Sequence, residues 1–251
     1  MTIRWTYAFI DRPRPGFGAA CAFWTAVTDT RLSELRGEQQ EFVTLLPDGG
    51  ADACVKVQAV GPGPGGAHPD FCVDDVAEFA AAAVRLGASV VTDLGSLVVL
   101  RSPGGQLFCA DPWRGQAARP GVVRGSRLDQ VCVDVPPSAY GAEVAFWSAL
   151  LAGWESRPGS LPEFHVIEPP SGLPVRLLLQ RLDEERPVSA HLDLACADPA
   201  GTRARHETLG AAFVAAFPGW TVMRDPAGGL YCLTSRDPAT GGVRAASAET
   251  A

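Results

Sequence analysis

The feature that most constrains this chain is an internal repeat with an offset of 123 residues. The stretch HPDFCVDD at residues 68–75 returns as HLDLACAD at residues 191–198. The same offset aligns the Phe-Trp pair at residue 23 with that at residue 146, and RSPGGQLFC at residue 101 with RDPAGGLYC at residue 224. Such a period is too long for a solenoid unit and indicates duplication of a whole domain. We therefore expect two copies of one fold.

The repeat also sets the expected domain boundaries. We predict one domain over residues 1–116 and a second over residues 124–238, joined through a stretch rich in Gly, Pro and Arg at residues 114–125. Residues 239–251 have little apolar content and are predicted to form a disordered tail. Of the 251 residues, 47% are hydrophobic and 20% are charged, which is a globular composition able to bury a sizeable core.

Charge and composition argue against several classes of function. A net charge of −7 without runs of Lys or Arg argues against nucleic acid and anionic membranes as partners. The sequence has no signal peptide pattern and no apolar run of about 18 residues, so we expect a cytoplasmic protein, either a monomer or a homodimer. The seven cysteines contain no Cys-x-x-Cys pair, which argues against a disulfide framework and against a thiolate zinc site.

Each copy is predicted to contain the same order of elements. Residues 5–11 alternate as a strand, and the next stretch has apolar residues at helical spacing. Two further strands follow before a strand through the His-x-Asp sequence. Asp75 is the expected N-cap of a second helix, and Gly87 lies just beyond its expected end. Strands turned at Pro-x-Gly close each copy, and the resulting fold class is α+β.

These features resemble the vicinal oxygen chelate superfamily, in particular its glyoxalase-like and bleomycin-resistance-type members, with two tandem domains. The resemblance rests on the repeated β-α-β-β-β module, the strand HLDL, the Asp-capped helix ending in Leu-Gly-Ala, and the final hairpin RDPAGGLYCL. It implies that each domain is built from two such modules that form one curved mixed sheet. One fold of this kind hosts many functions, so the chemistry has to be inferred from the site.

In the metal-using members of this superfamily, His and Glu side chains from several strands hold a divalent ion inside the curved sheet. The positions carried over from those ligands fall, domain by domain, on Tyr7, Gln58 and His68, and on Gln130, Gln180 and His191. Leu107 and Leu230 are placed at the carboxylate positions. One imidazole per domain is fewer than the three protein ligands of a typical catalytic metal. We therefore expect no metal and no other cofactor.

The candidate catalytic residues are His68 and His191, because imidazole titrates near neutral pH. Their other interpretation is a buried pair with a nearby acidic residue, inherited with the scaffold. Aromatic residues on one face of the first strand are candidates for stacking on a planar ligand, or they are packing. The full set of candidate ligand-binding residues is Trp5, Tyr7, Phe9, Lys56, Gln58, Asp70, Gln130, Gln180 and Asp193, with Arg176 as a second-domain counterpart of Lys56.

The sequence leaves interpretations from different classes open. The first is a protein without a catalytic metal that binds or sequesters a small organic ligand, such as an aromatic metabolite or an antibiotic. The alternative is a metal-independent isomerase or cyclase of specialised metabolism that uses His68 or His191 as acid or base. A metal-dependent lyase or dioxygenase ranks below both because of the ligand count. Stacking is expected to favour ligand binding in the first domain, and proton transfer is expected to favour the second.

Overall fold

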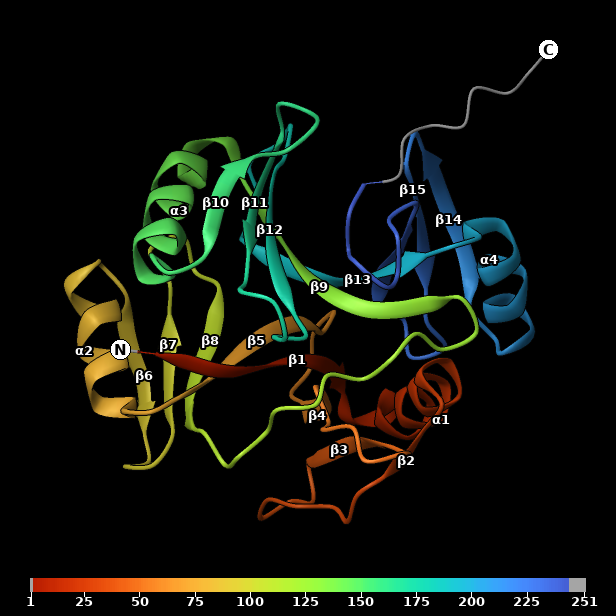
Figure 1. Ribbon diagram of the computed structural model, residues 1–251, viewed down its shortest axis with the longest axis horizontal. Helices are drawn as coiled ribbons and strands as arrows, with labels where there is room; N and C mark the ends of the chain where they lie inside the picture. Colours follow the sequence, from red (N-terminus) through yellow and green to blue (C-terminus); the bar gives the residue numbers. More distant parts are fainter. Residues whose placement is uncertain (1, 244–251) are drawn as a thin grey trace.

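The computed structural model of the protein, which describes residues 2–243, contains two eight-stranded sheets, one from each half of the chain (Figure 1). The first sheet has the order β2-β3-β4-β1-β5-β8-β7-β6, and the second has the order β10-β11-β12-β9-β13-β16-β15-β14. Both sheets mix parallel and antiparallel pairs. The predicted α+β fold with two tandem copies is confirmed.

The bounds of the elements follow the repeat. The first half consists of β1 (Ile3–Pro13), α1 (Phe17–Thr28), β2 (Thr30–Leu32), β3 (Phe42–Pro47), β4 (Val55–Val60), β5 (Gly66–Val73), α2 (Val76–Arg85), β6 (Ser89–Asp93), β7 (Val98–Arg101) and β8 (Leu107–Pro112). The second half consists of β9 (Ser126–Val135), α3 (Pro137–Leu150), β10 (Glu155–Pro158), β11 (Phe164–Glu168), β12 (Arg176–Arg181), β13 (Ser189–Cys196), α4 (Pro199–Thr208), β14 (Ala212–Phe217), β15 (Trp220–Arg224) and β16 (Leu230–Thr234). A short 3-10 turn, η1 (Arg14–Gly16), precedes α1.

Local signals explain where the second helix of each copy begins and ends. The carboxylate of Asp75 accepts a hydrogen bond from the backbone N–H of Glu78 at 2.8 Å, which satisfies a donor at the start of α2. Gly87 follows α2 with a φ of 105°, a left-handed conformation that glycine adopts without a Cβ clash. Asp198 caps α4 in the same way. The predicted cap and stop of α2 are confirmed.

The first strands of the two modules are neighbours at the centre of each sheet. In the first sheet β1 runs antiparallel to β5, and the register places Tyr7 opposite Asp70 and Phe9 opposite His68. In the second sheet β9 pairs with β13 in the equivalent register, so Gln130 lies opposite Asp193. This pairing brings the candidate residues of each half together at mid-sheet.

Each half also packs its first helix against the other half. Trp24 of α1 donates its indole N–H to the Asp225 carboxylate at 3.0 Å, and the neighbouring Phe23 ring lies edge-on to His206 of α4. In the opposite direction, Trp147 of α3 contacts the rings of Phe71 and Phe108 in the first sheet. One continuous hydrophobic core therefore includes residues from both halves. Trp24 and Trp147 therefore pack across the two halves rather than within one.

The connecting and terminal segments complete the described chain. Residues 113–125 contain no helix or strand, and an isolated bridge joins Val123 to Ser126. Residues 239–243, which the sequence assigns to a disordered tail, continue a turn after β16, whereas the rest of that predicted tail, 244–251, lies outside the described residues. None of the helices in residues 2–243 is long and apolar enough to cross a membrane.

Candidate functional site

Two clusters of His, Asp and Cys side chains lie on equivalent faces of the two sheets. Strand alternation directs Phe71 of β5 against Phe79 of α2, whereas His68 and Asp70 point to the opposite face. In each cluster the possible ligand atoms lie within 4.8 Å of one another. The clusters consist of His68, Asp70 and Cys109 in the first half and of Cys132, His191 and Asp193 in the second.

In the first cluster, the imidazole lies between two carboxylates. His68 Nδ1 lies 2.7 Å from Asp11 Oδ2, and its Nε2 lies 3.6 Å from Asp70 Oδ1. The ring also stacks on Phe9, with the centroids 4.5 Å apart. Burial lowers the pKa of His68, but the Asp11 carboxylate outweighs it and raises that pKa above its ordinary value. Each nitrogen of the His68 ring therefore already faces a carboxylate of the protein.

In the second cluster, hydrogen bonds fix the imidazole and the carboxylate. His191 Nδ1 lies 3.2 Å from Asp134 Oδ2, and its Nε2 lies 3.3 Å from Asp193 Oδ1. The amide of Gln130 donates to the other oxygen of Asp193 and accepts from Arg176 Nε at 2.6 Å. Asp193 Oδ1 is buried without a hydrogen-bond partner. An orphaned carboxylate oxygen of this kind is costly unless a cation or donor satisfies it.

Two thiols flank the second imidazole. The Cys132 thiol lies within 4.8 Å of His191 and Asp193 ligand atoms, and Cys232 lies opposite Asp193 and lines the same cavity as His191. Burial raises the pKa of both thiols above the ordinary value. Burial also lowers the pKa of His191, but Cys132, Asp134 and Cys232 outweigh it and hold that pKa well above its ordinary value. A divalent ion that bound Nε2 would displace the proton from that nitrogen.

A cavity of about 550 Å³ opens onto this second cluster. The cluster side is formed by Gln130, Cys132, Arg176, Gln180, His191, Asp193 and Cys232, and the walls include Phe164, Val166, Leu178 and Trp220. The volume is in the range of small-molecule sites.

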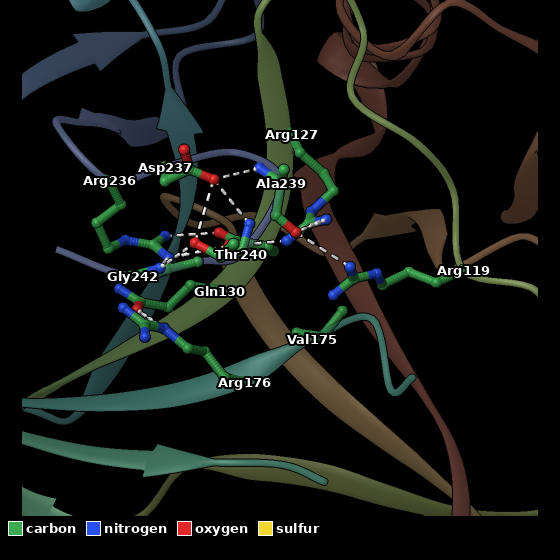
Figure 2. A network of polar contacts seen from close by, with 12 residues as sticks. Arg119, Arg127, Gln130, Val175, Arg176, Arg236, Asp237, Ala239, Thr240 and Gly242 are labelled. Carbon is green, nitrogen blue, oxygen red and sulfur yellow. Dashed lines mark hydrogen bonds and ion pairs between the residues drawn. The ribbon is translucent and has the colours of Figure 1, made fainter. Parts of the chain in front are cut away.

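The last described residues form one wall of this cavity. Residues 240–243 line it, and Arg236 holds the buried Asp129 with both of its terminal nitrogens, at 2.9 and 2.6 Å. Figure 2 shows the turn from Asp237 to Gly242 beside Gln130 and Arg176. The carbonyl of Ala239 accepts hydrogen bonds from Arg119 and Arg127, each at 3.1 Å. The turn is therefore tied to the segment that joins the two halves.

The other candidates of the first half are packed inside it. The Trp5 indole donates to the carbonyl of Ala53, and the Tyr7 hydroxyl accepts from Gln116. Lys56 lies over the rings of Tyr7 and Phe9, and Gln58 lies opposite Asp11 in the β1–β4 pair. In the second half Gln180 accepts a hydrogen bond from the thiol of Cys132. Of these residues, Phe9 and Lys56 contact the first cluster and Gln180 contacts the second.

The strands that begin with Leu107 and Leu230 bring Cys109 to the first cluster and Cys232 beside the second. Leu107 begins β8 and is 37% exposed, whereas Cys109 lies directly opposite Asp70. Cys232 has the equivalent position opposite Asp193 in β16. The sequence reading also missed Asp11 and its counterpart Asp134, which hold the imidazoles. Both pairs obey the 123-residue offset, and that offset is the signal that would have found them.

The second cluster fits a divalent transition metal. An imidazole nitrogen, a carboxylate oxygen and a thiol are present, and three protein ligands with an open position are typical of catalytic zinc sites. Thiolate and imidazole donors suit zinc, iron and cobalt better than magnesium or calcium. The orphaned Oδ1 of Asp193 is the atom that such an ion would satisfy.

Comparisons with known proteins agree with this architecture. A family model described as a glyoxalase-like domain matches residues 8–110 and again residues 130–234. No curated protein matches the chain. A mutant of 4-hydroxymandelate synthase from Streptomyces coelicolor has a TM-score of 0.63 at 15% identity, covering 96% of this chain and 95% of that one.

Two further solved structures extend the likeness. A Mn(II)-bound glyoxalase from Novosphingobium aromaticivorans has a TM-score of 0.63 at 15% identity, covering 92% of this chain and 82% of that one. A 2,2',3-trihydroxybiphenyl 1,2-dioxygenase from Sphingomonas wittichii has a TM-score of 0.59 at 15% identity, covering 93% and 90%. At these identities the likeness establishes a shared fold.

These findings correct the first interpretation of the sequence, a metal-free protein that binds or sequesters a ligand. The similar structures named above are a synthase, a glyoxalase and a dioxygenase, one of them metal-bound, and none is a resistance protein. The expectation of a metal-free site also rested on a ligand count that left out the cysteines, and each cluster supplies three possible ligand atoms. The interpretation ranked lowest, metal-dependent chemistry, is the one favoured.

Proposed function

Because this chain belongs to the glyoxalase-like domain family, whose model covers both of its halves, we propose that it is a metal-dependent enzyme with its active site in the second domain. The observation that carries the proposal is the opening of the second cluster into the cavity of about 550 Å³, beside an Asp193 oxygen that is buried and accepts no hydrogen bond. A buried ligand set next to a substrate-sized cavity is the arrangement that metal catalysis requires.

The residues that would hold the ion are His191 through Nε2, Asp193 through Oδ1 and Cys132 through Sγ. A divalent ion bound there would polarise a substrate oxygen and stabilise negative charge on it. Asp134 fixes the His191 ring through Nδ1, which leaves Nε2 directed at the cluster. Gln130 holds the second oxygen of Asp193, and Arg176 in turn holds Gln130. The ligands are therefore oriented before an ion binds.

The cavity favours a small organic substrate with a planar apolar part and a polar or anionic group. The ring of Trp220 packs edge-on to Phe164 in the wall and offers a surface for stacking. Arg157 and Arg176 line the same cavity and can donate hydrogen bonds to a polar or anionic group, and Arg176 is also paired with Glu168 of the lining at 2.6 Å. This combination, with the dioxygenases and the glyoxalase among the similar structures, supports lyase or dioxygenase chemistry on such a compound.

Cobalt binding tests the metal site directly. Co²⁺ titrated into the metal-stripped chain should give one equivalent of binding with a thiolate-to-cobalt absorption band. His191→Ala and Asp193→Asn should lose that equivalent, whereas the matched first-domain variant His68→Ala should keep it. A wild-type chain that binds no Co²⁺, or binding that survives both second-domain substitutions, would falsify the assignment.

Oxygen uptake tests the reaction class. The Fe²⁺-loaded chain is mixed with a panel of one-ring and two-ring catechols, and consumption of oxygen with ring-cleavage absorbance is the result expected for a dioxygenase. Asp193→Asn should abolish it. Turnover without oxygen uptake would assign the cavity to lyase chemistry instead.

A further inference from the structure

The first cluster contains a cation supplied by the protein itself. Lys56 Nζ lies 3.8 Å from Asp70 Oδ2 and 3.7 Å from Asp111 Oδ2. The same ammonium lies 4.0 Å from the ring centroid of Tyr7 and 5.0 Å from that of Phe9, which are cation–π distances. The Lys56 side chain is only 14% exposed. Two carboxylates and two aromatic rings therefore hold one largely buried ammonium at the edge of the cluster.

The residue of the second half that corresponds to Lys56 is the apolar Leu178, and not Arg176 as the sequence indicated. Lys56 lies opposite Phe9 in the β1–β4 pair, and Leu178 lies opposite Cys132 in the β12–β9 pair. Phe9 and Cys132 are related by the 123-residue offset, so Lys56 and Leu178 correspond. Leu178 lines the large cavity. The first cluster thus contains a lysine ammonium, whereas the second has an uncharged side chain at the equivalent position.

The remaining ligand set of the first cluster is nevertheless complete. His68, Asp70 and Cys109 place three possible ligand atoms within 4.8 Å, and Asp70 Oδ1 is buried without a hydrogen-bond partner, like Asp193 Oδ1. Asp70 itself is 1% exposed. A buried carboxylate requires a counter-charge, and an ammonium or a metal ion can each provide it.

We propose that Lys56 is the resident cation of the first domain and that its ammonium keeps a latent metal site, made of His68, Asp70 and Cys109, free of divalent ions. A divalent ion at this cluster would face the ammonium across Asp70, and like charges in a buried site repel strongly. The ligand class of the latent site is a thiophilic divalent ion such as Zn²⁺ or Co²⁺. The inference holds whether or not the second domain binds metal, because it concerns only the difference that Lys56 makes.

The test replaces Lys56 with the residue of the other half. Lys56→Leu should bind one more equivalent of Co²⁺ than the wild-type chain, with added thiolate-to-cobalt absorption from Cys109. Lys56→Arg keeps a cation and should show no gain. Lys56→Leu combined with His68→Ala should lose the extra equivalent, which assigns it to the first cluster. The number of Co²⁺ equivalents bound by the wild-type chain tests the metal site of the second domain. The gain on replacing Lys56 tests the first domain, so the two proposals can fail independently.

The reciprocal exchange and the unmodified chain provide two further checks. Leu178→Lys should reduce Co²⁺ binding at the second cluster by at least tenfold in a chain whose circular dichroism is unchanged. Lys56→Met serves as a second variant should Lys56→Leu fold poorly. The proposal is overturned if both folded Lys56 variants bind no more Co²⁺ than wild type. It is equally overturned if the unmodified chain binds an equivalent that His68→Ala removes.

Discussion

At the scale of single residues, the carboxylate of Asp225 joins the two halves. Its Oδ2 accepts hydrogen bonds from Arg12 Nε at 2.8 Å, from Arg12 Nη2 at 2.7 Å and from the Trp24 indole at 3.0 Å. Both charged side chains of the pair are at most 2% exposed. Arg12→Met leaves this charge buried without a cation, so we expect the free energy of unfolding to fall by about 3–5 kcal/mol in urea denaturation.

The control for this prediction is the exposed pair of Arg4 and Asp74, whose side chains are 47% and 44% exposed. Arg4→Met should change the free energy of unfolding by about 1 kcal/mol or less, because solvent screens the charges. The double variant Arg12→Met with Asp225→Asn should recover part of the loss. Equal effects of Arg4→Met and Arg12→Met would contradict the role given to the buried pair.

Gln130 is a positioning residue of the second cluster, because its amide links Arg176 to Asp193. Gln130→Met removes both hydrogen bonds and leaves a side chain of similar volume. Substitution of an outer partner of this kind typically weakens metal affinity 10- to 100-fold, so we expect about that increase in the Co²⁺ dissociation constant. Tyr7→Phe, at the equivalent first-domain position, is the matched control and should leave it unchanged. Calorimetric titration of both variants decides the point.

The residues of the clusters show how far sequence reasoning reaches. Alternation along β5 and β13 is enough to predict that each His and the Asp two positions later share a face. The thiols were missed because a free cysteine is usually a buried apolar residue. The residues next to Cys132 in the sequence do not distinguish a possible metal ligand from such a core cysteine. The two clusters differ at Lys56 and Leu178. The role of this difference could not be predicted, because it depends on side chains from other strands that lie beside these two residues.

At the scale of elements, α4 meets α1 through a buried histidine. His206 Nδ1 lies 3.0 Å from the Tyr231 hydroxyl, its Nε2 has no partner, and its ring is edge-on to Phe23. Burial, with a smaller contribution from Arg205, lowers the pKa of His206 to about 4. The folded chain thus binds this proton less readily than the unfolded chain, in which the pKa is about 6.5.

Stability should therefore fall as the pH is lowered from 6.5 towards 4. The contribution of His206 between pH 7.5 and 5.0 is about 2 kcal/mol of unfolding free energy. His206→Phe should remove that part of the pH dependence while other groups titrate as before. Urea denaturation of the wild-type and His206→Phe chains at pH 7.5 and 5.0 measures this contribution. An equal loss of unfolding free energy in the two chains would exclude His206 as the cause.

At the scale of elements the order of strands and helices could be read from the sequence, since caps, glycines and alternation are local signals. The sheets that the first helices α1 and α3 pack against could not be predicted from the sequence. Trp24 and Trp147 have the apolar spacing of any helix that covers a sheet, and the spacing carries no information on which sheet is covered. Only the folded arrangement shows that each helix reaches the other half.

At the scale of the whole molecule, the shared core makes each half dependent on the other. Cutting the chain at residue 119 would expose Phe23 and Trp24 in the first half and Phe146 and Trp147 in the second. We expect each half alone to be aggregated or without cooperative unfolding, and the two halves expressed together to form a 1:1 complex. Gel filtration and thermal circular dichroism test this, and a monomeric half with a sharp unfolding transition would contradict it.

The turn after β16 has a consequence for the time course of binding. Its Ala239 carbonyl is held by Arg119 and Arg127, and its residues 240–243 form a wall of the cavity. A compound that entered past this wall could do so only as those hydrogen bonds open, and it would meet the same barrier on leaving.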